Sequence, residues 1–336
     1  MKSNKKILAI TITIIVAVSI ISGVFLYINY QQGPVGKMDS VTIALPPLEQ
    51  DALMYVAANQ RFFGNNNLNV TFRNYNSGTT AINSLLSGEA NIAESAEYPF
   101  VNNAFQNQTI SIIACNDEFQ NSYIVALKNH GINNISDLKG KRIGVDKGTI
   151  AEFYLGRFLQ LNGMNIQDVD LVNVIPSEYV SVIANGTVDA LAAWQPYINQ
   201  IQNQMGGIAS WQLNSAQQAF GILICSNGWL SQHADVAERF LKALDEAQNY
   251  ILNNPSKAKV IVQNQLNYTS SYIDSVWPLH DFSLSLDQSL VTAMQDEAQW
   301  MINNQFTNQT QIPNFTNYIY TRGLIAVNPQ SVTLFT

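Results

Sequence analysis

Short apolar runs alternate with amphipathic segments along most of this chain. Apolar runs rich in β-branched residues are typical of buried strands, and apolar positions that recur every three or four residues are typical of helices. The pattern predicts strands at 41–45, 69–73, 91–94, 110–115, 123–127, 142–145, 171–175, 189–193 and 220–225. Between them it predicts helices at 51–60, 79–86, 99–105, 150–161, 177–184 and 196–204. Strands separated by helices in this way predict an α/β fold with parallel sheets that are covered on both faces.

After residue 225 the pattern predicts helices and no further strands. A segment at 234–252 carries Val236, Phe240 and Leu244 on one face, and the run Asn253-Asn254-Pro255 is expected to end it. Shorter helices are predicted at 256–265, 270–276 and 286–302.

The chain begins with lysines followed by a long apolar run. Lys2, Lys5 and Lys6 precede an apolar segment at 7–27, which is close to the ~20 residues that a bilayer-spanning helix needs. The lysines favour a short cytoplasmic stub at 1–6 and an extracytoplasmic remainder, joined through a linker at 28–40. A signal peptide cleaved near residues 17–19 is the alternative. We therefore expect a protein that works outside the cytoplasm, anchored to the cell membrane by an N-terminal helix or secreted.

Composition narrows the classes of partner. The 336 residues have a net charge of −7 and only 12% charged side chains, and no basic run follows residue 6. A nucleic-acid partner is therefore not expected. The two cysteines, Cys115 and Cys225, each end a predicted strand. A disulfide between them and two separate buried thiols are both possible interpretations. The number and separation of the cysteines do not indicate a metal site.

The stretch from 142 to 161 combines a strand, a glycine turn and a helix start. The turn reads Asp146-Lys147-Gly148-Thr149, and Thr149 is placed to cap the following helix. Free backbone N–H groups would then point outward from the carboxyl end of the strand. In open α/β sheets, small ligands bind at that edge.

These residues also carry a resemblance to a known family. The motif DLKGKRIGVDKGT, followed by GTVDA and by Trp194-Gln195-Pro196-Tyr197, resembles the substrate-binding proteins of ABC importers. The group is the one for nitrate, sulfonate, taurine or bicarbonate uptake, with thiamine-pyrimidine-precursor-like members, and its fold is the periplasmic-binding-protein type II fold. The resemblance extends from about residue 41 to the C-terminus.

The resemblance implies two α/β lobes and a helical C-terminal tail. Lobe 1 would comprise 41–118 plus 221–336, and lobe 2 would comprise 123–219. Two crossings near 119–122 and 219–221 would join them, and a ligand bound between the lobes would favour a closed state. The C-terminal helices would pack on lobe 1.

Every loop at the carboxyl end of a predicted strand is a candidate for ligand contact. The candidates are Pro47, Leu48, Ser77, Gly78, Thr79, Ser95, Glu97, Tyr98, Gly148, Thr149, Trp194 and Gln195. Several have ordinary structural alternatives: Ser77 and Thr79 also suit a helix cap, and Trp194 also suits the core. Asp51, beside the first loop, is expected to cap the next helix.

Glu94 and Glu97 bear on the charge of the solute. A receptor for an anion would not normally place two carboxylates against its ligand, so Glu97 could instead bind an ammonium or hydroxyl group. Glu97 also suits the first turn of a helix, where a carboxylate offsets the helix dipole.

No catalytic motif is found in the sequence. His130, His233 and His280 lie outside any nucleophile–base pattern, and no G-x-S-x-G, H-E-x-x-H or P-loop motif occurs. The Cys-rich motif of a related branch that makes the thiamine pyrimidine is also absent.

We therefore expect a monomeric, cofactor-free and metal-free receptor, not an enzyme. It would capture a small polar solute, nitrate-, sulfonate- or taurine-like, and deliver it to an ABC permease with its ATPase subunit. A cationic or pyrimidine-like solute, or an enzyme on the same scaffold, is the alternative.

Overall fold

A computed structural model describes residues 38–335 of the chain. From Asp39 onward the chain folds as one compact unit. The apolar segment at 7–27 and most of the linker at 28–40 lie outside the described residues. Within residues 38–335, no helix has the length and apolar character needed to cross a membrane.

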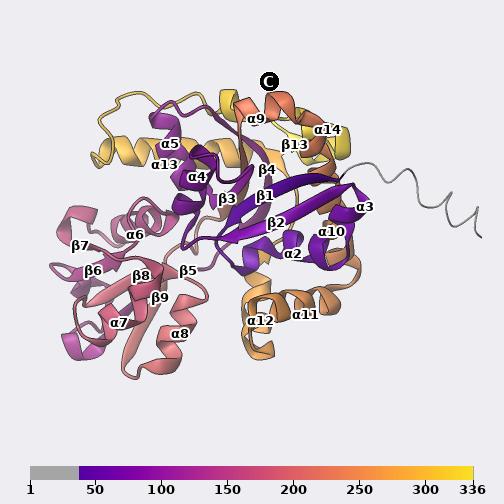
Figure 1. The fold of residues 1–336 in the computed structure, drawn as a ribbon. Helices are drawn as coiled ribbons and strands as arrows, with labels where there is room; N and C mark the ends of the chain where they lie inside the picture. The colour runs from indigo at the N-terminus through magenta and orange to yellow at the C-terminus, as the bar shows by residue number, and fades with distance from the viewer. Residues whose placement is uncertain (1–37, 336) are drawn as a thin grey trace, which may run out of the picture. The chain divides into compact units, whose positions relative to one another are not determined.

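Two sheets organise the fold (Figure 1). The first has six strands in the order β11-β4-β10-β3-β1-β2. Their bounds are β1 (Asp39–Leu45), β2 (Leu68–Asn74), β3 (Ile92–Ala96), β4 (Ile110–Phe119), β10 (Ala219–Ser226) and β11 (His280–Asp281). The second has five strands in the order β7-β6-β8-β5-β9. Their bounds are β5 (Ser122–Leu127), β6 (Arg142–Val145), β7 (Asp170–Asn173), β8 (Ala190–Trp194) and β9 (Ile208–Gln212).

Both sheets are mixed, which corrects the expectation of parallel sheets. Strand β1 is parallel to β2 and β3, and β6 is parallel to β7 and β8. Strand β10 is antiparallel to β3 and β4, and β5 is antiparallel to β8 and β9. The reversed strands β5 and β10 are the first strands after the chain passes from one sheet to the other. The chain leaves one sheet at the carboxyl ends of its parallel strands and enters the other sheet at the same kind of edge. The entering strand must therefore run opposite to the parallel strands of the sheet that it joins.

Helices cover these sheets. They are α2 (Ala52–Asn59), α3 (Phe62–Asn65), α4 (Gly78–Leu86), α5 (Glu97–Phe105), α6 (Ile150–Leu161), α7 (Tyr179–Ala184), α8 (Tyr197–Gln204), α9 (Asn227–Gln232), α10 (Ala234–Asn253), α11 (Pro255–Leu266), α12 (Ser270–Val276), α13 (Gln288–Asn303) and α14 (Arg322–Val327). Strand β6 and helices α6 and α12 have the predicted bounds.

The prediction that strands stop after residue 225 is wrong. Strand β11 pairs with β4, and the two-residue strands β12 (Leu286–Asp287) and β13 (Val332–Thr333) pair with each other. Segments of two residues are too short to show a period. Strand β9 and helices α3, α9 and α14 were also not predicted, and β9 is only partly buried.

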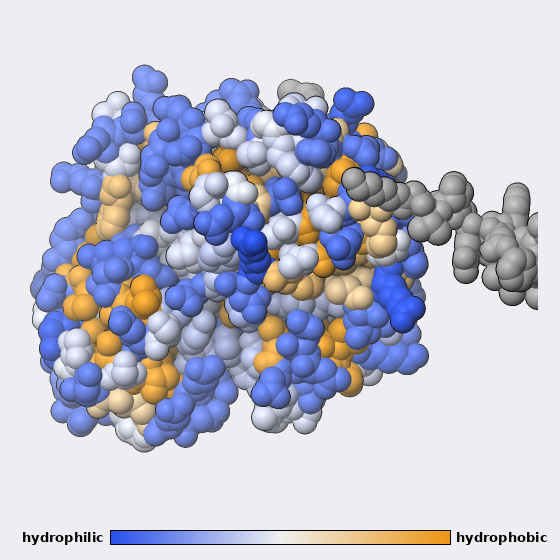
Figure 2. Space-filling view, in the orientation of Figure 1, coloured by the Kyte–Doolittle hydropathy of each residue, from blue (hydrophilic) through white to orange (hydrophobic). Residues whose placement is uncertain are grey.

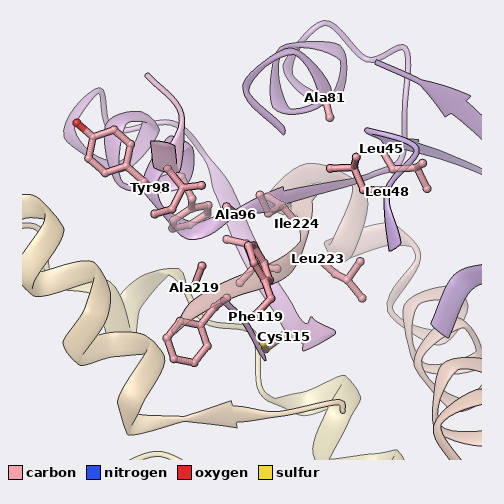
Figure 3. Packing of buried hydrophobic residues seen from close by; sticks show 14 of the residues in the cluster. Leu45, Leu48, Ala81, Ala96, Tyr98, Cys115, Phe119, Ala219, Leu223 and Ile224 are labelled. Carbon is pink, nitrogen blue, oxygen red and sulfur yellow. The ribbon is translucent and has the colours of Figure 1, made fainter. Parts of the chain in front are cut away.

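The C-terminal helices contribute to the core of the six-stranded sheet. Phe240 of α10 is fully buried and stacks on Phe63, with ring centroids 5.6 Å apart. Figure 3 shows part of this core, with Leu45 and Leu48 near each other and Phe119 close to Ala219, its partner in the strand pairing. Cys115 and Cys225 are both buried, free thiols.

The chain passes between the sheets at two neighbouring segments. One is Gln120 and Asn121, between β4 and β5, and the other is 213–218, between β9 and β10. Asn214 joins them, because its Nδ2 donates to the carbonyl of Phe119 and its Oδ1 accepts from the N–H of Ser122, both at 3.3 Å. In Figure 2 the surface is hollowed between the part that carries α8 and the part that carries α12.

Candidate functional site

A small cavity lies where strand ends from both sheets meet. Its volume is about 30 Å³. Nine lining residues come from the six-stranded side: Pro46, Leu48, Gln50, Ser77, Gly78, Ser95, Ala96, Pro99 and Phe119. Three come from the five-stranded side: Thr149, Ile150 and Trp194. The cavity is therefore walled by both sheets.

The N-terminus of α4 forms one wall. Ser77 is the residue before the helix, and its N–H donates to the Thr80 hydroxyl at 3.1 Å. Helix α4 packs so closely on β3 that a Cβ at Gly78 would lie 2.2 Å from Ser95 Oγ. Glycine is required here because any side chain would collide with β3. The first turn of α4 contains no acidic residue, and the Ser77 side chain meets the backbone N–H of Thr80. The N–H groups of Gly78 and Thr79 and the positive dipole end are therefore the ones left for a ligand.

The N-terminus of α6 forms a second wall. Gly148 has a φ of +77°, a conformation that glycine adopts without steric cost. Thr149 precedes the helix as predicted, but its hydroxyl does not cap it and instead donates to the carbonyl of Asp146 at 2.6 Å. Glu152, in the first turn of α6, folds back instead, and its carboxylate accepts from the N–H of Gly148 at 3.0 Å.

The two helix starts are in direct contact. The Thr79 hydroxyl donates to the carbonyl of Gly148 at 3.0 Å. Beside this contact, burial raises the pKa of Asp146 to about 6, although a hydrogen bond from Ser77 partly opposes the shift. The starts of α4 and α6, one beside each sheet, are thus joined next to the cavity.

Two polar groups in the cavity wall lack a hydrogen bond to any residue of 38–335. They are the buried indole Nε1 of Trp194 and the buried hydroxyl of Ser95. The Trp194 ring is held edge-on by Tyr179 and Tyr197, with centroids 6.1 and 6.0 Å away. An unpaired buried donor costs about 1–3 kcal/mol, which an acceptor on a ligand would recover. No lysine or arginine is among the lining residues.

Behind the cavity lies a cluster of buried acids. Gln50 lines the cavity, and its Nε2 donates to Glu94 Oε1 at 2.6 Å. Burial raises the pKa of Glu94 to about 8, with Asp117 adding to the shift and the Gln50 hydrogen bond opposing it. Burial and the neighbouring Glu94 raise the pKa of Asp51, and burial raises that of Asp117 to about 7.

His280 supplies the positive charge of this cluster. Its Nδ1 lies 2.5 Å from Asp117 Oδ2. Burial opposes protonation, but Asp117 and Glu49 outweigh it and raise the pKa of His280 to about 10. The hydroxyls of Tyr268 and Tyr272 donate to Glu49 at 3.3 and 3.2 Å. Within the described residues, no group of three or more His, Cys, Asp or Glu side chains is arranged to hold a metal ion.

Six of the candidate residues line the cavity and six do not. Those that line it are Leu48, Ser77, Gly78, Ser95, Thr149 and Trp194. Thr79 and Gly148 make the contact between the helix starts. Pro47 is half-buried outside the lining, and Gln195 Oε1 accepts from the N–H of Asn199 at 3.1 Å.

Glu97 and Tyr98 point into the protein core. Glu97 Oε2 accepts from the N–H of Phe220 at 3.0 Å, and burial raises its pKa to about 7. The Tyr98 ring stacks on Phe153 of α6 at 5.7 Å and meets the edge of Trp300 on α13.

Comparison with known proteins identifies the family. The model of the "NMT1/THI5 like" family matches residues 49–258, which is more than half of the chain. The chain belongs to the NMT1/THI5-like family.

Two relatives of this chain are named as binding proteins. A Brucella abortus protein named only as a binding protein is 27% identical over 168 residues, which is 49% of this chain and 52% of the relative. The chain thus matches about half the length of the first curated relatives. The taurine-binding periplasmic protein of Escherichia coli is 25% identical over 64% of this chain and 67% of that protein.

Solved structures share the periplasmic-binding-protein-like α/β fold. The alkanesulfonate-binding protein SsuA of Xanthomonas axonopodis pv. citri, bound to MOPS, superposes with a TM-score of 0.75 at 15% identity. The match covers 85% of this chain and 99% of that one. The desulfurization enzyme DSZB superposes with a TM-score of 0.64 at 13% identity over 87% of this chain and 99% of that one. The fold alone therefore hosts both binding and catalysis.

Sequence reasoning missed half of the lining of this NMT1/THI5-like protein. The missed residues are Pro46, Gln50, Ala96, Pro99, Phe119 and Ile150. Most are neighbours of named candidates, so the strand-end rule located the right loops but not each side chain. Phe119 carried no signal, because strand β4 was predicted to end at residue 115. Asp51 was expected to cap α2, but its Oδ2 instead accepts from the preceding N–H of Leu48 at 3.4 Å.

Proposed function

We propose that this protein is an extracytoplasmic solute-binding receptor of an ABC importer. It captures a small polar solute in the cavity between lobe 1 (41–118 plus 221–336) and lobe 2 (123–219), and it delivers the solute to the permease and its ATPase. The protein works as a monomer, and the apolar segment at 7–27 anchors it to the membrane or is cleaved on export.

One observation carries this proposal: the cavity presents unused hydrogen-bond donors beside a helix start. The donors are Trp194 Nε1, the Ser95 hydroxyl and the first N–H groups of α4. Together they suit the oxygens of a nitrate or sulfonate group without a basic side chain. The names of the taurine-binding and alkanesulfonate-binding relatives agree with that class.

Capture requires the lobes to separate. The cavity of about 30 Å³ is far smaller than the roughly 300–1,000 Å³ of ordinary ligand sites. A solute therefore enters an open form and stabilises the closed one through its contacts with both walls. The hydrogen bond from Thr79 to Gly148 belongs to the closed form.

Calorimetric titration with propane-1-sulfonate and nitrate tests the proposal. Trp194→Phe keeps an aromatic wall and removes the N–H, so it should weaken binding of the preferred anion about tenfold. Trp229→Phe, on α9 away from the cavity, should leave affinity unchanged. Equal affinity in the wild type and Trp194→Phe would exclude this site.

A cationic or pyrimidine-like solute is the second candidate. It is favoured by the buried acids behind Gln50 and by the aromatic walls Phe119 and Trp194. A thermal-shift screen separates the two: stabilisation by amines or aminopyrimidines, with none by oxyanions, would select this candidate.

In either case the receptor makes and breaks no bond. Bound solute recovered after long incubation should have an unchanged mass. A changed mass that depends on the folded protein would establish catalysis instead.

A further inference from the structure

Gln50 is held at both ends. Its side chain is almost fully buried, and Nε2 donates to Glu94 Oε1 at 2.6 Å. Its backbone carbonyl accepts from Asn116 Nδ2 at 3.1 Å. A residue fixed at its backbone and at its amide nitrogen has little freedom to rotate.

The remaining polar atom of this amide, Oε1, is free to face the cavity. Gln50 is one of the lining residues, and within residues 38–335 no side chain or backbone group donates to its Oε1. With Oε1 as the free atom of this amide, Gln50 would offer the cavity an acceptor on one wall, whereas Trp194 Nε1 and the α4 start provide donors on the others.

Glu94 is built into the fold as the partner that fixes this orientation. It is fully buried on β3, and a Cβ at Gly221 of β10 would lie 3.3 Å from its Oε1. Its other oxygen, Oε2, is buried and has no hydrogen-bond partner in the part of the chain that the structure describes. A proton on this carboxyl therefore belongs on Oε2, which leaves Oε1 as the acceptor for Gln50 in both protonation states.

We propose that Gln50 is a specificity-determining residue and that Glu94 is its positioning residue. Together they select oxyanion solutes that also carry a hydrogen-bond donor, such as hydroxy-substituted sulfonates, over plain alkyl sulfonates of the same size. This inference rests on the proposed function, because it assigns the substrate class of the same cavity. A solute that lacks the donor leaves the Gln50 acceptor unpaired and is rejected.

An isosteric pair of ligands tests the inference. 2-Hydroxyethanesulfonate and propane-1-sulfonate differ by a hydroxyl in place of a methyl group. The wild type should bind the hydroxy compound about tenfold more tightly. Gln50→Leu should abolish this preference while it retains propane-1-sulfonate binding.

Variants of Glu94 separate positioning from folding. Glu94→Gln still offers an oxygen to Gln50 Nε2 and should keep the tenfold ratio, whereas Glu94→Leu should reduce it toward one. The ratio of two affinities does not respond to a general loss of stability. Glu94→Met, which also lacks the oxygen, replaces Glu94→Leu if that variant fails to fold, and an unchanged ratio in it would overturn the positioning role of Glu94.

The failures are distinguishable. Equal binding of both sulfonates by the wild type, or an unchanged ratio in Gln50→Leu, would overturn this inference and leave the receptor function standing. No binding of either sulfonate by the folded wild type would overturn both.

Discussion

Thr79 and Gly148 are joined by a hydrogen bond of 3.0 Å from a side-chain hydroxyl to a backbone carbonyl. Thr79 lies in the first turn of α4, beside the six-stranded sheet, and Gly148 precedes α6, beside the five-stranded sheet. The bond therefore links the helix starts that form the two walls of the cavity.

Thr79→Val should weaken solute binding without disturbing the lobes themselves. Valine keeps the shape and removes the donor, so the closed form should lose about 0.5–1.5 kcal/mol. Affinity should fall roughly three- to tenfold in calorimetric titration. Thr292→Val removes an exposed hydroxyl that bonds within α13 and should leave affinity unchanged. Equal losses in both variants would show that the Thr79 contact has no role in closure.

Gly78→Ala should destabilise the fold and damage the site. The new Cβ would lie 2.2 Å from Ser95 Oγ and 2.8 Å from Ser95 Cα, and overpacking of this kind costs about 1–3 kcal/mol. Adding Ser95→Ala should not fully restore stability, because the clash with the backbone remains. Denaturant unfolding of the single variant and of the double variant measures these two losses of stability.

Gly228→Ala is the matched control for this change. Gly228 lies in α9, and a Cβ there would meet nothing within 4 Å. The stability of the Gly228→Ala variant should change little or rise, because alanine favours a helix more than glycine does. A loss as large as that of Gly78→Ala would point to backbone freedom instead of the contact with Ser95.

Local sequence predicted local structure well. Strand β6 and helix α6 have their predicted bounds because Gly148 and Thr149 mark the turn between them. The same rule located the loops of the cavity. The directions of β5 and β10 were not predictable, because a fully apolar strand reads the same in either direction.

The acidic cluster was hidden for a different reason. Gln50 and Glu94 are 44 residues apart, and Asp117 and His280 are 163 residues apart. The sequence indicates Glu94 only as the end of a predicted strand with a bearing on the solute's charge, and nothing in it links Glu94 to Gln50, Asp117 or His280. Only the pairing of distant strands brings these side chains together, and no local pattern records it.

Asp189→Asn should destabilise the five-stranded sheet. Asp189 accepts from the Arg142 backbone N–H and guanidinium and meets His130 Nδ1 at 2.7 Å. These contacts, Arg142 first, hold the pKa of the Asp189 carboxyl well below its usual range. The loss at neutral pH should be about 1–3 kcal/mol, since charged hydrogen bonds contribute roughly that much.

The pH dependence of Asp189→Asn has a defined sign. A depressed pKa contributes stability above the unfolded value of about 3.9, and that contribution is lost as pH falls below it. The gap between wild type and Asp189→Asn should therefore be full at pH 6 and shrink toward pH 2. Asp274→Asn, which removes an exposed pair with Lys259, should show a small gap. A gap that grows in acid would contradict this assignment.

Glu297→Gln should make the protein more stable in alkali than the wild type. Glu97 and Glu297 are fully buried and close to each other, and burial raises the pKa of both, that of Glu97 to about 7. A raised carboxyl pKa means that the folded state keeps protons that the unfolded state releases, so stability falls as pH rises from about 4.5 toward the folded value. Each such proton contributes a slope of about 1.4 kcal/mol per pH unit.

Glu297→Gln removes one titrating group and supplies a donor to Glu97. The stability of this variant in denaturant unfolding should therefore decline less steeply between pH 5 and 8 than that of the wild type. Glu238→Gln, at an exposed position on α10, should follow the wild-type slope, and a Glu297→Gln slope equal to it would show that the buried pair does not share a proton.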